Sequence, residues 1–191
     1  MTQPKPDAQP RAQLRKDLIA KRRAIPEAQK NAWDSAIAQN VLHHLKQYPS
    51  QVLGVFWPIQ AEPDLMLAYQ ALYTMGVQLA LPVVQAAHAP LQFFAWAPGD
   101  VMDTDRYGIP IPQANQAQLQ PDCLLIPCVG FNEEHFRLGY GGGFYDRTLA
   151  QNQSLQIKVR TIGIGYADTQ VEFNADSHDV AMDCIITEKR S

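Results

Sequence analysis

The sequence predicts an α/β fold: a single-domain layered sheet, mainly parallel, with helices on both faces. Short apolar runs of strand length alternate with longer segments whose apolar residues recur every three or four positions. The run at 123–129 is almost continuously apolar, which is typical of a central parallel strand covered on both sides. The length of 191 residues, 46% of them hydrophobic, suits one domain, so we expect 1–191 to form a single unit.

The first predicted helix lies close to the N-terminus. We expect residues 1–8 to be disordered, because they are polar and proline-rich, and a helix to follow over about 8–24. Its apolar stripe has the spacing i, i+4, i+11 and consists of Leu14, Leu18 and Ile25. The same spacing recurs in a row of arginines, Arg11, Arg15 and Arg22. This row lies roughly 60° around the helix from the apolar stripe, so the guanidinium groups belong at the rim of the packing surface or on a solvated face.

Helices and strands alternate along the rest of the chain. A second helix is expected over 26–48, because proline suits a first turn and apolar residues recur every four positions at Trp33, Ile37, Val41 and Leu45. A third is expected over 63–75, closed by Gly76, and a fourth over 144–152. The intervening apolar runs predict strands at 52–57, 77–84, 91–96, 123–129, 161–165 and 184–187.

Residues 97–121 interrupt this alternation. They are rich in proline, glycine, aspartate and glutamine and contain the segment YGIPIP at 107–112. We expect a long ordered loop over the surface, and loops of this length in a compact domain often carry function.

Composition and charge exclude several classes of protein. A net charge of −3 argues against broad electrostatic binding to nucleic acid. No apolar run approaches the ~18 residues of a membrane span, and the N-terminus lacks the apolar core of a signal peptide. The cysteines do not have the spacing of a zinc ribbon or a redox pair, and we expect reduced thiols at Cys123, Cys128 and Cys184. We therefore expect a cytoplasmic monomer that binds small molecules, and neither nucleic acid nor membrane.

The segment 137–147, RLGYGGGFYDR, concentrates glycine between a predicted central strand and a predicted helix. Four of the eleven glycines of the chain lie at 139–143, which calls for a backbone explanation. Consecutive glycines let backbone N–H groups approach an anion, and the start of the helix adds the positive end of its dipole. A purely structural turn would not need the flanking Arg137, Asp146 and Arg147, so we favour a phosphate-binding loop. The segment has neither the Lys-Ser/Thr ending of a P-loop nor the spacing G-x-G-x-x-G.

Asp146 is the carboxylate closest to this loop in the sequence. Mg²⁺ bound to a nucleotide usually takes one or two protein carboxylates together with phosphate oxygens and water. A second carboxylate could come from the stretch 176–183, DSHDVAMD, although aspartates at a strand edge more often act as turn or capping residues. Spacing alone does not select one of them.

Six motifs occur in order along nearly the whole chain. They are R-x-x-x-R at Arg11 and Arg15, E-P-D at Glu62, Y-G-I-P-x-P at 107–112, D-x-x-x-x-P-x-x-G-F at 122–131, R-L-G-Y-G-G-G-F-Y-D-R at 137–147 and H-D-x-x-x-D at 178–183. This series resembles the 5-formyltetrahydrofolate cyclo-ligase family, also called 5,10-methenyltetrahydrofolate synthetase. The glycine-rich motif is highly specific to that family.

The resemblance implies an ATP- and Mg²⁺-dependent ligase with one α/β domain. The reaction it implies closes 5-formyltetrahydrofolate to 5,10-methenyltetrahydrofolate through phosphorylation of the formyl oxygen, with release of ADP and phosphate. By the resemblance, ATP would be held by Arg11, Arg15, Arg137, Leu138, Gly139, Tyr140, Gly141, Gly142, Gly143, Phe144 and Tyr145. The folate would be held by Trp57, Glu62 and Tyr107, and Mg²⁺ by Asp146 and Asp183. No catalytic acid, base or nucleophile is assigned.

Other functions remain open from the residues alone. A sugar-phosphate isomerase or a CoA-transferase-like enzyme would also use a phosphate loop, and a non-catalytic folate- or nucleotide-binding protein would keep the same binding residues. The R-x-x-x-R pair favours a polyphosphate ligand. Without the resemblance, Glu62 is more simply a helix-start carboxylate and Trp57 a core residue. The acidic cluster Asp176/Asp179 and His178 receive no role.

Overall fold

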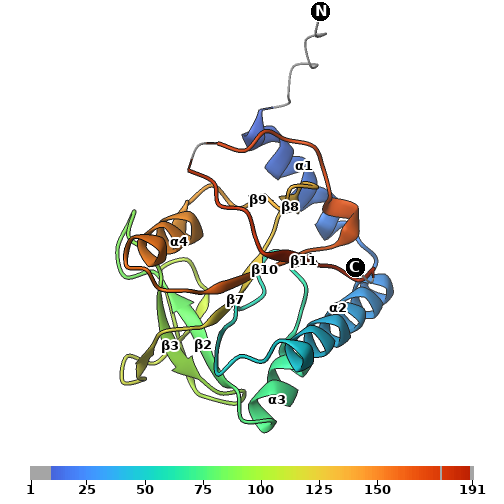
Figure 1. Cartoon of the computed structure of the whole chain (residues 1–191). Coiled ribbons are helices and arrows are strands. Elements are labelled where there is room, and N and C mark those ends of the chain that lie inside the picture. Colours follow the sequence, from blue (N-terminus) through green and yellow to red (C-terminus); the bar gives the residue numbers. More distant parts are fainter. Residues whose placement is uncertain (1–9, 177, 190–191) are drawn as a thin grey trace, which may run out of the picture.

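A mostly parallel sheet of seven strands forms the centre of the molecule (Figure 1). The computed structural model describes residues 10–176 and 178–189, so the disorder expected for residues 1–8 lies outside the described residues. The strand order is β11-β10-β7-β1-β2-β3-β6, and β3 runs antiparallel to both of its neighbours. The strands are β1 (Val52–Gly54), β2 (Gln78–Val83), β3 (Gln92–Trp96), β6 (Gln118–Leu119), β7 (Cys123–Pro127), β10 (Arg160–Ile164) and β11 (Cys184–Ile186). The predicted fold class is confirmed.

Helices cover both faces of this sheet. In Figure 1, α2 (Glu27–Gln47) and α3 (Met66–Thr74) lie on one side and α4 (Phe144–Ser154) on the other. Buried side chains of α2 and α3 belong to one core cluster, and Leu149 of α4 belongs to a second. The first helix, α1 (Arg11–Arg23), packs through Leu18 on a third, smaller cluster. The four predicted helices are therefore all present.

Strand β7 is buried on both of its faces, which explains its continuously apolar sequence. Leu125 points into the core beneath α2 and α3, whereas Leu124 and Ile126 point into the core beneath α4. Because successive side chains of a strand point to opposite faces, a strand covered on both faces has no solvated position. Burying one such side chain contributes roughly 1.5–3 kcal/mol.

The segment predicted as a loop, 97–121, contains three short strands. Besides β6, a hairpin pairs β4 (Met102–Thr104) with β5 (Pro110–Pro112). The Asp105 carboxylate accepts hydrogen bonds from the backbone N–H groups of Tyr107 and Ile109 at 2.8 and 2.9 Å, and Gly108 supplies a φ of +78°. The segment is ordered, as expected, but it also contains strands that the sequence did not predict, because strands of two or three residues are too short to produce a periodic pattern.

A second hairpin leads into the glycine-rich segment. Strand β8 (Gly130–Phe131) pairs antiparallel with β9 (Arg137–Leu138). The side chain of Asn132 closes the turn by accepting a hydrogen bond from the N–H of Phe136 at 2.9 Å. This hairpin fixes where Arg137 and the glycines leave the sheet.

The connections from β1 and β7 diverge, and this divergence locates the site. The chain passes from β1 to its neighbour β2 on one side, and from β7 to its neighbour β10 on the other. In open α/β sheets, ligands bind at the carboxyl ends of the two strands where the connections part in this way. The topology therefore predicts a ligand site beyond Gly54 and Pro127.

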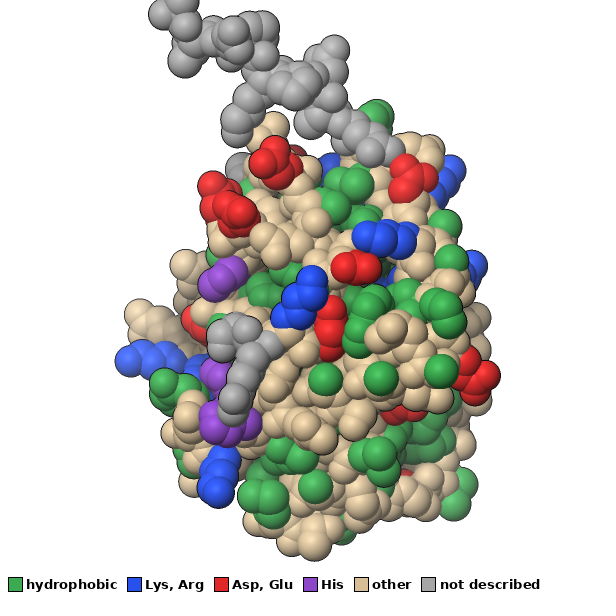
Figure 2. Space-filling view, turned by 90° about the vertical axis from the view of Figure 1, so that its right-hand side faces the viewer, with side chains coloured by type: hydrophobic (Ala, Val, Ile, Leu, Met, Phe, Trp, Pro, Cys, Tyr) green, Lys and Arg blue, Asp and Glu red, His purple; other side chains and the backbone are tan. Residues whose placement is uncertain are grey.

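The lengths of the helices and the distribution of surface charge bear on binding to membranes and nucleic acid. Every helix in the described part of the chain is too short or too polar to cross a bilayer. On the side of the molecule in Figure 2, Lys and Arg side chains are scattered among acidic ones. The charges on this side therefore do not form a basic patch.

Candidate active site

A cavity of about 680 Å³ opens at the carboxyl ends of β1 and β7. Its size falls within the range of roughly 300–1,000 Å³ that is usual for small-molecule sites. Most residues implicated by the sequence line it: Arg11, Arg15, Trp57, Glu62, Tyr107, Arg137, Gly139, Tyr140, Gly141, Gly142, Gly143, Phe144, Tyr145 and Asp146. Segments far apart in the chain thus converge on the position that the topology indicates.

Two of the implicated residues lie elsewhere. Leu138 is fully buried and packs with Leu18 of α1, so its side chain supports the loop from behind. Asp183 precedes β11, and its carboxylate accepts hydrogen bonds from the backbone N–H and the hydroxyl of Thr161 at 2.7 and 3.0 Å. Because β7, β10 and β11 are parallel, Asp183 lies at their amino ends, whereas the cavity lies at the carboxyl ends. The structure therefore separates Asp183 from Asp146, and the two do not form a shared metal site.

The glycine loop, residues 139–143, has a backbone that favours glycine at two positions. Gly141 has a φ of +91° and Gly143, which caps α4, has a φ of +65°. The loop is held from both sides: Arg15 Nε donates to the carbonyl of Gly139 at 2.8 Å, and Arg147 Nη2 donates to the carbonyl of Gly142 at 2.7 Å. Arginine guanidinium groups therefore hold the loop on both sides.

A partly buried ion pair lies at the start of α4. Arg137 is only 6% exposed, and its Nη2 donates to Asp146 Oδ1 at 2.5 Å. The Arg137 guanidinium also lies over the ring of Tyr145, 5.8 Å from its centroid. Asp146 is in the first turn of the helix, where the dipole favours a negative charge. One carboxylate oxygen of Asp146 is thus committed to Arg137.

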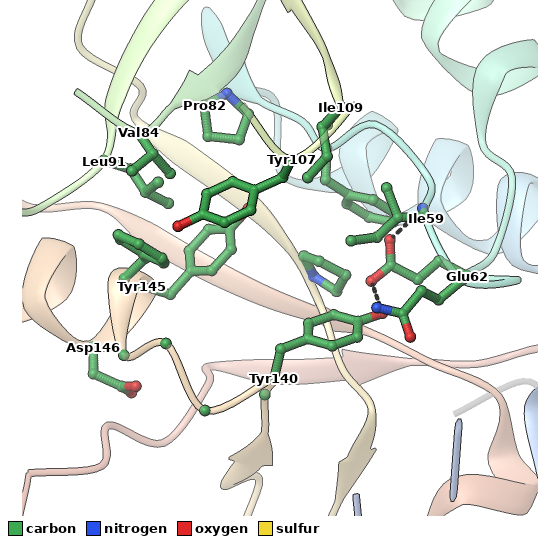
Figure 3. Close-up of a pocket in the computed structure, with 18 of the residues that line it drawn as sticks. Ile59, Glu62, Pro82, Val84, Leu91, Tyr107, Ile109, Tyr140, Tyr145 and Asp146 are labelled. Atoms are coloured by element: carbon green, nitrogen blue, oxygen red, sulfur yellow. Dashed lines mark hydrogen bonds between the residues drawn. The ribbon is translucent and has the colours of Figure 1, made fainter. Parts of the chain in front are cut away.

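Glu62 is a buried carboxylate at the opposite end of the cavity. Its Oε1 accepts a hydrogen bond from the Tyr140 hydroxyl at 2.6 Å, and its Oε2 accepts one from the N–H of Ile59 at 2.9 Å (Figure 3). Burial raises the pKa of Glu62, and both hydrogen bonds and the nearby charge of Arg22 oppose that rise. Burial likewise raises the pKa of Tyr140, with the negative charge of Glu62 as the second cause. The tyrosine therefore remains protonated and donates to the carboxylate.

Aromatic and apolar side chains form the wall between these two ends. In Figure 3 the rings of Tyr107 and Tyr145 point into the space bordered by Pro82, Val84 and Leu91. The Tyr107 side chain is the most exposed of them at 61%, because it projects from the tip of the β4–β5 hairpin. Half-buried Trp57 meets Trp96 edge to face, with 6.1 Å between the ring centroids. Trp57 therefore packs against the core and also lines the cavity.

The acidic cluster near the C-terminus reaches the same cavity. Arg11 pairs with Asp176 and, at 2.8 Å, with Asp179, while its guanidinium lies over the ring of Phe173. Asp176, His178 and Asp179 place one ligand atom each within 4.8 Å of one another. Sequence patterns alone assigned these three residues no role, because aspartates at a strand edge more often act as turn or capping residues. Arg11 already compensates the two carboxylates, so its charge is less available to a ligand than that of Arg15.

The chain is similar in sequence to known proteins of one family. The family model described as the 5-formyltetrahydrofolate cyclo-ligase family matches residues 7–188. The 5-formyltetrahydrofolate cyclo-ligase of Mycoplasma pneumoniae is 31% identical over 178 residues, which cover 92% of this chain and 97% of the relative. The protein of the same name from Mycolicibacterium smegmatis is 30% identical over 189 residues, 94% of each chain.

A solved structure extends the similarity to the fold. The 5,10-methenyltetrahydrofolate synthetase from Mycoplasma pneumoniae superposes with a TM-score of 0.79 at 27% identity, covering 95% of this chain and 100% of that one. The similarity in sequence and in structure thus runs over nearly the whole length. The chain belongs to the 5-formyltetrahydrofolate cyclo-ligase family.

Proposed function

We propose that this ligase converts 5-formyltetrahydrofolate to 5,10-methenyltetrahydrofolate while ATP is hydrolysed to ADP and phosphate. The observation that carries the proposal is one cavity in which a glycine- and arginine-lined end adjoins an aromatic and apolar end. Transfer of a phosphoryl group requires donor and acceptor to be held in line, and a shared cavity with these two linings suits a nucleotide and a pterin.

The end of the cavity at the glycine loop suits the triphosphate of ATP. Arg15 and Arg137 line it, and a guanidinium can donate two parallel hydrogen bonds to a phosphate. The first turn of α4 has backbone N–H groups without partners inside the helix, and its dipole favours an anion. These groups together support binding of the β- and γ-phosphates at this end.

Replacing Arg15 tests this part of the proposal. We expect Arg15→Ala to lower kcat/KM for ATP by about 10- to 150-fold, corresponding to the roughly 1.5–3 kcal/mol of a charge-assisted hydrogen bond. The free energy of unfolding should change by less than about 1 kcal/mol, because Arg15 is at the rim of the cavity. Lys16→Ala is the matched control, since Lys16 is the exposed neighbouring cation. Equal kinetics for the two variants would assign Arg15 to a solvated face.

The other end of the cavity suits the folate. Trp57 and Tyr107 offer aromatic rings, which favour stacked or edge-to-face contact with a flat heterocycle. Each oxygen of Glu62 makes one protein hydrogen bond, which leaves it capacity to accept from the N–H groups of a pterin. We therefore propose Trp57, Tyr107 and Glu62 as folate-binding residues.

The proposed chemistry begins by activating an oxygen that is otherwise a poor leaving group. The formyl oxygen attacks the γ-phosphorus of ATP, a P–O bond forms, and the bond from this phosphorus to the bridging oxygen breaks to release ADP. N10 then adds to the formyl carbon and loses its proton, and the C–O bond breaks to release phosphate. The protein contributes orientation and positive charge, and orientation alone can supply about 7–11 kcal/mol of a barrier.

Asp146 is the residue that fits Mg²⁺. It lines the cavity at the start of α4, and Arg137 engages one of its two oxygens. Mg²⁺ commonly takes one carboxylate and completes its coordination with phosphate oxygens and water. The ion would neutralise charge on the phosphates.

A pair of isosteric variants tests this assignment. Asp146→Asn keeps an acceptor for Arg137 but removes the charge, so we expect the Mg²⁺ concentration for half-maximal activity to rise at least about tenfold. Asp183→Asn keeps the acceptor for Thr161 at the other end of the sheet and should leave that concentration unchanged. A comparable rise in the Asp183 variant would restore the metal pair inferred from the resemblance.

An isotope experiment tests the reaction itself. With ¹⁸O in the formyl group of the substrate, we expect the label to appear in the inorganic phosphate that is released. A methenyl product formed with unlabelled phosphate would contradict phosphorylation of the formyl oxygen.

A further inference from the structure

Arg22 of α1 is buried beneath the active site. Its side chain is only 1% exposed, and in the described chain it takes part in no salt bridge. Its guanidinium instead donates to three acceptors from three separate segments: the Gln60 carbonyl at 3.0 Å, the Cys128 carbonyl at 3.4 Å and the Tyr140 hydroxyl at 2.5 Å. A buried cation with such partners needs an explanation beyond packing.

The chemistry of arginine fixes the direction of the hydrogen bonds that follow. A guanidinium only donates, so the Tyr140 oxygen must accept from Arg22 and its own proton must go to Glu62. The Tyr140 ring is also close to the guanidinium, with 5.9 Å from Cζ to the ring centroid. Arg22 therefore sets both the position of the tyrosine ring and the orientation of its hydroxyl.

The contact with Gln60 holds an unusual turn. Gln60 and Ala61 have φ values of +50° and +60°, a conformation that L side chains rarely adopt. Such a conformation persists only where neighbouring contacts determine it. The Arg22–Gln60 hydrogen bond and the bond from the N–H of Ile59 to Glu62 supply those contacts.

We propose that Arg22 is a positioning residue that couples the two ends of the active site. It joins the turn 59–62, which carries Glu62, to the glycine loop through Tyr140. A nucleotide that orders the glycine loop also orders Tyr140, and through Arg22 the turn that meets the folate. Each ligand therefore increases the affinity for the other by the same factor. This inference rests on the proposed function, and Arg22 itself touches neither ligand.

The test measures how each ligand affects the affinity for the other. Calorimetric titration gives the Kd of a non-hydrolysable ATP analogue with and without 5-formyltetrahydrofolate. We expect the folate to lower this Kd at least about fivefold in the wild-type protein and to leave it nearly unchanged in Arg22→Met. Arg23→Met is the control, because among the described residues the exposed Arg23 side chain donates only to the Gln60 side chain, at 3.4 Å. This variant should keep the wild-type ratio of the two Kd values, without and with folate.

The outcomes separate this inference from the proposed function. The coupling would be overturned, and the proposed function left intact, if the folate did not change the Kd of the ATP analogue in the wild-type protein. The same holds if the folate lowered this Kd equally in the wild-type protein and in Arg22→Met. Wild-type protein that binds neither ligand would overturn both. A merely structural role would lower the melting temperature of Arg22→Met without changing the ratio of the two Kd values.

A second variant tests the coupling if Arg22→Met does not fold. Tyr140→Phe removes only the hydroxyl between Arg22 and Glu62. Loss of the ratio there supports the coupling, and its retention overturns it.

Discussion

Gly141→Val is expected to abolish ATP-dependent turnover in a protein that still folds. Gly141 has a φ of +91°, and a Cβ added there would lie 3.5 Å from Arg15 Cζ, an ordinary contact that the ligand-free protein tolerates. The two methyl groups of valine extend beyond that Cβ into the space where a phosphate must approach the backbone. The unfavourable φ costs about 1–3 kcal/mol, which lowers the melting temperature by roughly 2–10 °C.

A second glycine provides the control for backbone strain. Gly99 has a similar φ of +97°, is exposed, and has no atom within 4 Å of an added Cβ. Gly99→Val should therefore lose a similar amount of stability and keep its turnover. Melting temperature and kcat are measured on the same preparations. If folded Gly141→Val turned over at a near-normal rate, the glycine loop would not be the phosphate site.

Glu62→Gln is expected to lower kcat/KM for the folate at least about 100-fold. Each oxygen of Glu62 accepts a hydrogen bond, so the amide of glutamine must turn its NH₂ group towards a donor, either Tyr140 or the N–H of Ile59. The variant loses the negative charge that meets the pterin and leaves a buried donor unpaired, a cost of about 1–3 kcal/mol in stability. Glu188→Gln is the control, because Glu188 also accepts a backbone N–H but lies outside the cavity.

The pH dependence gives an independent readout of Glu62. Its pKa is raised by burial, and the ionised form is the one that accepts from the pterin. The wild-type kcat/KM for the folate should therefore fall as the pH falls through this raised pKa, and the same acid limb should be missing in Glu62→Gln. An identical acid limb in both proteins would show that another group titrates.

Most of the fold follows from short-range patterns in the sequence. The four-residue repeat from Trp33 to Leu45 lies within α2, and the apolar run at 123–129 contains β7. These predictions succeed because burial on one face of a helix, or on both faces of a strand, leaves a direct trace in the sequence. The hairpins around 102–112 and 130–138 leave no such trace, because their strands have only two or three residues and side-chain hydrogen bonds determine their turns.

The positions of two charged residues near the site could not be predicted from the sequence, because they depend on contacts between distant segments. Arg22 shares its spacing with Arg11 and Arg15, yet it is buried, because acceptors from three distant segments meet it. Asp183 is close to the acidic cluster in sequence, but the parallel direction of the strands carries it to the other end of the sheet. In both cases the position of the side chain depends on tertiary structure, because it is set by segments that are distant in the sequence.

The central claim is that one active site uses ATP to close the folate ring. The most direct measurement follows the absorbance of 5,10-methenyltetrahydrofolate in purified protein supplied with 5-formyltetrahydrofolate, Mg²⁺ and ATP, with ADP quantified in the same samples. We predict one ADP for each methenyl product, and no product when ATP is omitted. Binding of both ligands without product, or product without ADP, would contradict the account.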